Sequence, residues 1–117
     1  MMLSMIVDAS ALYAFFVRGA PEHWRVANEI ELAGPGEELV VSPLSLSALE
    51  AMILPAFGHG GWVTALRQLA AGAWSVAAID AAHIEKMAAH IGAGETLERA
   101  SAMVLAEEHG TDLVSAR

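Results

Sequence analysis

The chain of 117 residues contains no cysteine. This absence excludes a disulfide framework and a thiolate metal site, and it agrees with a reducing cytoplasm, where we expect the protein. Basic residues are also scarce: six Lys and Arg stand against 14 Asp and Glu, for a net charge of −8. The bases are scattered and form no basic patch. RNA therefore remains a possible partner only if folding, metal ions or another protein builds the contact.

The sequence also lacks a long uninterrupted apolar run. The longest window without a charged residue, residues 51–66, is broken by Pro55 and by several glycines. A membrane-spanning helix of about 20 apolar residues rarely tolerates such interruptions. Residues 1–7 have neither the basic start nor the apolar length of a secretory signal. We therefore expect no membrane segment and no export.

What the chain does contain is apolar surface. Hydrophobic residues make up 56% of the sequence and charged residues only 17%. The length predicts one domain over residues 1–117. So much apolar surface indicates elements that are covered on more than one side, as in a layered α/β fold or an oligomer. A homodimer or another protein partner fits this excess. Core packing is the default role of Trp24, Trp62 and Trp74, with at least one of them expected at an interface.

The apolar periodicity predicts strands that alternate with helices. Strands are expected at residues 3–7, 39–41, 74–79 and 111–116, and helices at 11–18, 21–32, 43–54, 62–71, 81–91 and 95–109, with a loop at 58–61. Helical connections of this length require crossovers between parallel strands. The fold class is therefore α/β, a three-layer α/β/α domain with a central, mostly parallel sheet of about four strands.

Asp8 follows the first predicted strand directly, and Ser10 precedes the first predicted helix. In open α/β sheets, functional sites lie beyond the carboxyl ends of the strands. Asp8 is therefore a candidate site residue. The alternative is that Asp8 only assists Ser10, a good N-cap residue, in starting the helix at residue 11.

Three segments carry a family resemblance: residues 5–12 (MIVDASAL), 39–50 (LVVSPLSLSALE) and 99–106 (RASAMVLA). Together they resemble the PIN domain, particularly the VapC-type toxins of toxin–antitoxin pairs. The resemblance implies an endoribonuclease in which three or four carboxylates hold Mg²⁺ or Mn²⁺ ions that activate water. It also implies an antitoxin-like protein partner.

Only part of the family's pattern of site residues is found in this sequence. Its first acid matches Asp8, and its supporting hydroxyl matches Ser10. Its second acid falls on Ala48 and its third on Arg99, and residues 114–117 offer no counterpart to its fourth. The resemblance therefore implies a degenerate acidic site, at which Asp8 binds a metal weakly if at all. Mg²⁺ or Mn²⁺ is the implied cofactor, but we do not expect tight binding.

A cation at an acidic position suggests that Arg99 forms an ion pair with Asp8 where the metals would lie. The alternative is that Arg99 extends into solvent. Glu95 lies four residues before Arg99 on the same helix face and is a possible substitute acid. Glu98 is rotated from Arg99 by about 100° and is expected to face elsewhere.

Two other groups of polar residues were considered as sites. His83 and His90 share a helix face, but no third donor for a zinc site is evident, so half-buried or surface histidines are expected. Ser42, Ser45 and Ser47 lie close together without a nucleophile turn, and their preference for helix starts explains them.

Two functions follow from the sequence. The first is a VapC-like PIN protein that lacks most metal-binding carboxylates, is catalytically impaired and acts by protein binding. The alternative is an active Mg²⁺-dependent endoribonuclease toxin of a toxin–antitoxin pair. The two differ in whether Asp8 faces a metal ion or Arg99.

Overall fold

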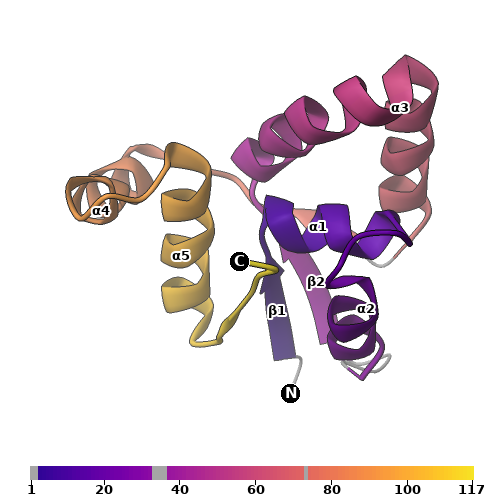
Figure 1. Cartoon of the computed structure of the whole chain (residues 1–117). Coiled ribbons are helices and arrows are strands. Elements are labelled where there is room, and N and C mark those ends of the chain that lie inside the picture. The colour runs from indigo at the N-terminus through magenta and orange to yellow at the C-terminus, as the bar shows by residue number, and fades with distance from the viewer. Residues whose placement is uncertain (1–2, 33–36, 73) are drawn as a thin grey trace.

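The computed structural model describes residues 3–32, 37–72 and 74–117. Within these residues, four strands form one sheet in the order β3-β2-β1-β4, and every neighbouring pair is parallel. The strands are β1 (Leu3–Val7), β2 (Glu37–Val41), β3 (Trp74–Val76) and β4 (Leu113–Val114). The helices are α1 (Ala9–Phe16), α2 (His23–Leu32), α3 (Pro43–Ala71), α4 (Ala81–Gly92) and α5 (Leu97–His109). The predicted α/β class is confirmed (Figure 1).

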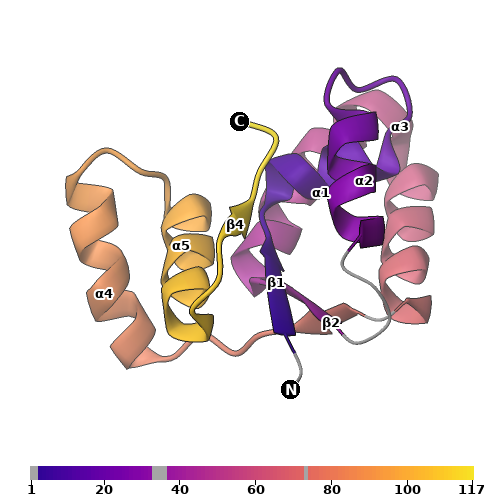
Figure 2. The ribbon, with the colours of Figure 1, turned by 90° about the horizontal axis from the view of Figure 1, so that it is seen from below.

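The two central strands are covered on both faces. Val7 and Val41 belong to the core cluster shared with Leu12 of α1 and Leu49 of α3. The neighbouring residues in the strands, Ile6 and Val40, pack instead against α5 through Ala102, Leu105 and Ala106. Because successive strand side chains point to opposite faces, this division produces three layers. Helices α4 and α5 lie side by side on one flank of the sheet (Figures 1 and 2).

The first helix starts earlier than predicted. It begins at Ala9, and its N-cap is Asp8, whose Oδ1 accepts a hydrogen bond from the Ala11 backbone N–H at 2.9 Å. The prediction that Ser10 is the N-cap is therefore wrong. Asp8 has an extended backbone, and its side-chain oxygen reaches the third helical N–H. Asp8 alone therefore connects the strand to the helix.

The predicted break between two helical segments is found at Gly58, but the predicted loop at residues 58–61 is too long. α3 runs from Pro43 to Ala71 through Pro55, and inside it only Gly58 leaves the helical conformation, with φ of 71°. Glycine tolerates a positive φ without steric cost, so one residue bends the chain and helical turns resume at once. Figure 1 shows the two arms of α3 pointing in different directions.

Smaller differences affect the edges of other elements. β2 starts at Glu37 rather than residue 39, and β3 ends at Val76 rather than residue 79. α5 begins at Leu97, after the N-cap Thr96. β3 and β4 are edge strands of this sheet and hydrogen-bond on one side only, which favours short strands.

The tryptophans divide as the composition suggests. Trp62 and Trp74 pack against the core, whereas Trp24 on α2 is 67% exposed. Trp24 is therefore available for an interface. No helix within the described ranges is both long and apolar enough to cross a membrane.

Candidate functional site

Asp8 lies at the carboxyl end of the central strand β1, and its side chain is 1% exposed. Its Oδ1 accepts hydrogen bonds from Ser10 Oγ at 2.7 Å and from the Ala11 backbone N–H at 2.9 Å. Its Oδ2 accepts a hydrogen bond from Arg99 Nη1, also at 2.9 Å. The predicted ion pair is thus confirmed. A buried carboxylate needs such partners to remain charged.

Arg99 is held from several sides. Its side chain is 21% exposed, so the alternative that it extends into solvent is wrong. Nη1 also donates to Ser115 Oγ at 2.9 Å, and Nε lies 3.2 Å from Glu95 Oε2. Glu95 in turn lies 3.9 Å from Arg117 Nη1. Glu95 therefore reaches the site as predicted from its helix face, but it does so by pairing with the arginines.

Ser10 and Ser115 connect the first helix to the segment after β4. Ser10 Oγ donates to Asp8 and accepts a hydrogen bond from the Ala116 backbone N–H at 3.0 Å. Its oxygen lies 3.1 Å from Ser115 Oγ. Sequence reasoning missed Ser115, because only acids were sought there. Ser115 lies directly after the observed strand β4, whereas the predicted strand extended to residue 116 and so included it.

Glu98 also faces this region, contrary to expectation. Its Oε2 accepts a hydrogen bond from Ser45 Oγ at 2.6 Å and lies 3.5 Å from the backbone nitrogen of Ala9. The rotation of about 100° from Arg99 is real, but the amino ends of α1, α3 and α5 meet at one edge of the sheet. Side chains from adjacent positions of α5 therefore reach different neighbours at the same edge.

Three buried serines, Ser42, Ser45 and Ser101, lie around Glu98. Ser42 is the N-cap of α3, as its helix-start preference predicts, and its Oγ lies 2.6 Å from Ser101 Oγ. Ser101 Oγ also donates to the backbone carbonyl of Glu98 at 2.6 Å. The network leaves no buried side-chain polar atom unsatisfied among the described residues. The serines thus position Glu98 and join α3 to α5.

The Ser45→Ala variant is expected to lose about 2 kcal/mol of unfolding free energy, because a hydrogen bond to a charged group contributes about 1.5–3 kcal/mol. Ser45 is fully buried and donates to Glu98. Urea denaturation measures the loss. Ser47→Ala, at an exposed position of the same helix, is the matched control and should change stability by less than about 0.5 kcal/mol. Equal effects would contradict the assigned role of Ser45.

The donor set does not fit a centre of clustered carboxylates around a divalent ion. Both oxygens of Asp8 are engaged, and a guanidinium group lies against the carboxylate. Ala48 offers no donor, and Glu50 lies on the exposed side of α3. Within the described ranges, no group of three or more His, Cys, Asp or Glu side chains is arranged to hold a metal ion. Hard cations require several oxygen ligands, so the residues present favour the ion pair.

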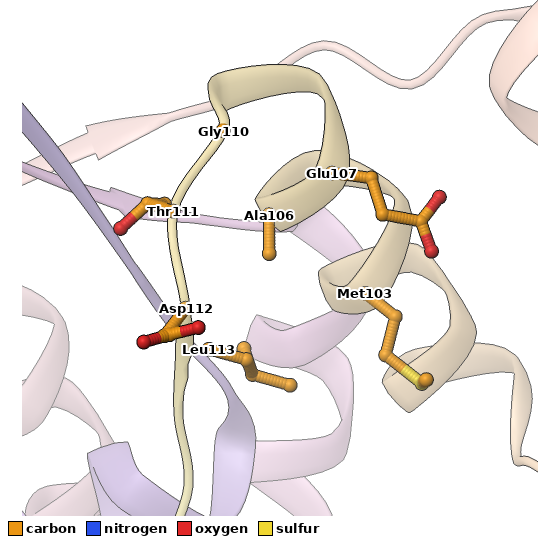
Figure 3. A pocket seen from close by; sticks show the side chains of 7 residues that line it. All are labelled: Met103, Ala106, Glu107, Gly110, Thr111, Asp112 and Leu113. Atoms are coloured by element: carbon orange, nitrogen blue, oxygen red, sulfur yellow. The ribbon is translucent and has the colours of Figure 1, made fainter.

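A pocket of about 560 Å³ lies at the other end of β4, between the end of α5 and the start of the strand. Figure 3 shows its lining, which includes Glu107 and Asp112 on opposite sides. Asp112 precedes β4 and therefore lies at the amino edge of the parallel sheet. This pocket is separate from Asp8 and contains no comparable cluster.

Comparisons with known proteins found a similar sequence and a similar structure. No family model matches the sequence. Ribonuclease VapC26 of Mycobacterium tuberculosis (strain ATCC 25618 / H37Rv) is 38% identical over 84 residues, which are 72% of this chain and 61% of that protein. The chain thus spans about three fifths of the relative's length. The crystal structure of VapC20 of Mycobacterium tuberculosis, described as a sarcin-ricin loop cleaving toxin, has a TM-score of 0.81 and 14% identity, covering 100% of this chain and 90% of that one. At this identity the likeness shows the fold.

Proposed function

Because this chain belongs to the PIN-domain family, with a VapC-type protein as its relative, we propose that it is a VapC-like domain that binds a protein partner and does not cleave RNA. In this proposal, the acidic centre is closed by an internal ion pair between Asp8 and Arg99. The relative is named as a ribonuclease, but a shared fold does not require this chain to have the same activity.

The observation that carries the proposal is the 2.9 Å contact between Arg99 Nη1 and Asp8 Oδ2. Arginine is permanently charged, and its planar donors match a carboxylate closely. A divalent ion that binds Asp8 would have to displace the Arg99 guanidinium from the carboxylate. The ion would then still lie close to this positive charge. Asp8, Glu95 and Glu98 supply three negative charges and Arg99 and Arg117 two positive ones, so the local net charge is −1. This charge attracts a divalent ion weakly.

Protein binding is supported by the surface. Several large apolar side chains are more than half exposed, namely Trp24, Leu32, Phe57, Val76, Ile84 and Leu97. Exposed aromatic and aliphatic side chains are characteristic anchors of protein interfaces. The charge of −8 disfavours nucleic acid as the primary partner. An antitoxin-like protein is the proposed partner, and a homodimer uses the same apolar surface.

The second candidate is an active Mg²⁺-dependent endoribonuclease. It is favoured by the retention of Asp8 and Ser10 at the end of β1 and by the relative named as a ribonuclease. In this alternative, Arg99 has to leave Asp8 before a metal ion binds. The chemistry then depends on whether Glu95 and Glu98 can turn toward the same ion.

We expect Mn²⁺ to leave the melting temperature of the protein unchanged, because the centre offers too little negative charge. Binding at 100 times the dissociation constant would add about 2.7 kcal/mol of stability, a shift of roughly 10 °C for a domain of this size. Differential scanning fluorimetry measures it. Arg99→Asp returns a carboxylate to the centre and is expected to gain a Mn²⁺-dependent shift.

Incubation with RNA separates the two candidates further. The proposal expects no cleavage by the purified protein, with or without Mn²⁺, and an intact RNA band after Asp8→Asn as well. Metal-dependent cleavage that disappears in Asp8→Asn would establish the nuclease and refute the proposal.

A further inference from the structure

Helix α4 is held against α5 by two histidines. His83 and His90 are seven residues apart, so they lie about 20° from each other around the helix and share one face. His83 Nε2 lies 2.5 Å from Glu108 Oε2, and His90 Nε2 lies 2.8 Å from Glu107 Oε1. Both histidines are half-buried, as the sequence predicted. Figure 2 shows the two helices side by side.

The apolar part of this contact is small. Met87 is the buried residue of α4, and it packs with Ala100 and Val104 of α5. Leu44 and Ile79 complete the cluster from α3 and from the segment before α4. None of these neighbours is titratable. The two histidine contacts are the polar part of what joins α4 to α5.

The charges around His83 favour its protonated form. Glu107 and Glu108 are adjacent like charges in the last turn of α5, where the helix dipole is negative. A cationic imidazole offsets both unfavourable effects. The other charged groups on these helices do not enter the contacts: Glu85 and Lys86 are exposed on α4, and His109 is exposed at the end of α5.

His83 has a second acidic neighbour. Its Nδ1 lies 2.7 Å from Oδ1 of Asp80, the N-cap of α4. An unprotonated Nδ1 accepts a hydrogen bond from the Asp80 backbone N–H at 3.2 Å, whereas a protonated Nδ1 donates to Oδ1. Only a protonated ring donates from both nitrogens to the two carboxylates, whereas a neutral ring keeps one donor. Desolvation lowers the pKa of His83, but the hydrogen bonds to Glu108 and Asp80 outweigh it and raise the pKa above 6.5. This stabilisation is complete below pH 6.5 and is lost as pH rises through the raised pKa.

We propose that α4 is a pH-dependent strap: protonated His83 holds it on Glu108, beside the contact of His90 with Glu107, and deprotonation of His83 loosens α4 from α5. Loosening uncovers the apolar face that contains Ala100 and Val104. Since α5 also carries Arg99 in its first turn, the strap stiffens the helix that closes the acidic centre. The proposal is independent of the proposed function, because it needs neither a metal nor a partner.

Hydrogen exchange with mass spectrometry tests the strap. After correction for intrinsic exchange, the protection of α4 amides relative to β1 amides is expected to fall severalfold between about pH 6 and about pH 9, the range over which His83 loses its proton. The double variant Glu107→Gln, Glu108→Gln is expected to lose this pH dependence, while Glu85→Gln on the exposed face keeps it. Equal protection at both pH values, or an unchanged pH dependence in the double variant, overturns the proposal.

NMR provides a readout that needs no variant. The imidazole signals of His83 and the methyl signal of Met87 are expected to change over the same pH range. A Met87 signal that stays constant while His83 titrates would show that α4 remains docked, and the strap would then be refuted.

Discussion

Replacing Arg99 with methionine is expected to lower the free energy of unfolding by about 3 kcal/mol, because removing one partner of a buried ion pair costs about 3–5 kcal/mol. Asp8 is almost fully buried, and Arg99 is its cationic partner. Ser10 and the Ala11 backbone still donate to Asp8 in the variant, which places the cost at the lower end of the range. Methionine keeps much of the arginine stem, so lost packing contributes little.

A double-mutant cycle isolates the charge interaction. In the background of Asp8→Asn, Arg99→Met is expected to cost less than about 1 kcal/mol, because no buried charge is left unpaired. Arg67→Met, at an exposed position of α3, is the matched control and should change stability by less than about 0.5 kcal/mol. Urea denaturation of the four proteins measures each value. An equal cost of Arg99→Met in both backgrounds would show that the pair is not coupled.

The exposed ion pairs of α2 provide a contrast. Arg25 lies 2.6 Å from Glu22 and 3.0 Å from Glu29, and these three side chains are 42–44% exposed. Exposed pairs typically contribute less than about 1 kcal/mol, despite short distances. Burial, rather than distance, is therefore the reason that Arg99 should matter more than Arg25.

The Leu12→Ala variant is expected to lose about 3 kcal/mol of stability, since burying a smaller side chain leaves a cavity and such changes cost about 2–5 kcal/mol. Leu12 is fully buried in the core cluster, on the helix whose N-cap is Asp8. For a domain of this size, the loss lowers the melting temperature by roughly 10 °C. Thermal unfolding followed by circular dichroism measures it.

Leu32→Ala is the matched control for this substitution. Leu32 ends α2 and is 84% exposed, so the same chemical change should alter stability by less than about 0.5 kcal/mol. A comparable loss in both variants would mean that helix propensity, rather than core packing, determines the effect.

Much of the architecture could be predicted from local patterns. The strand that ends at Val7, the helix that begins at residue 81 and the helix that ends at residue 109 follow from signals carried by neighbouring residues, and all three are found in the structure. The N-cap at the first helix was assigned to Ser10 rather than Asp8 because both residue types cap helices well. The sequence could not separate them, since the choice depends on which of the two residues has an extended backbone.

The candidate site was predictable for the residues that a family pattern or a shared helix face indicates, namely Asp8, Ser10, Arg99 and Glu95. Asp8 and Arg99 were identified because a family pattern assigns both positions to one centre, although they are 91 residues apart in sequence. Ser115 and Glu98 were missed or assigned elsewhere, since their roles come from contacts with Ser10, Ala9 and Ser45 on other elements. Such contacts have no periodicity that a sequence reveals.

The sequence by itself determined the class of fold, the order of its elements and the scarcity of acids at the family's positions, because periodicity, turn residues and residue identity are local properties. Only the tertiary structure decided that Arg99 lies on Asp8, that the break in α3 is confined to Gly58, and that His83 and His90 meet Glu108 and Glu107. Those contacts arise when helices pack on a shared sheet, and packing depends on all elements at once.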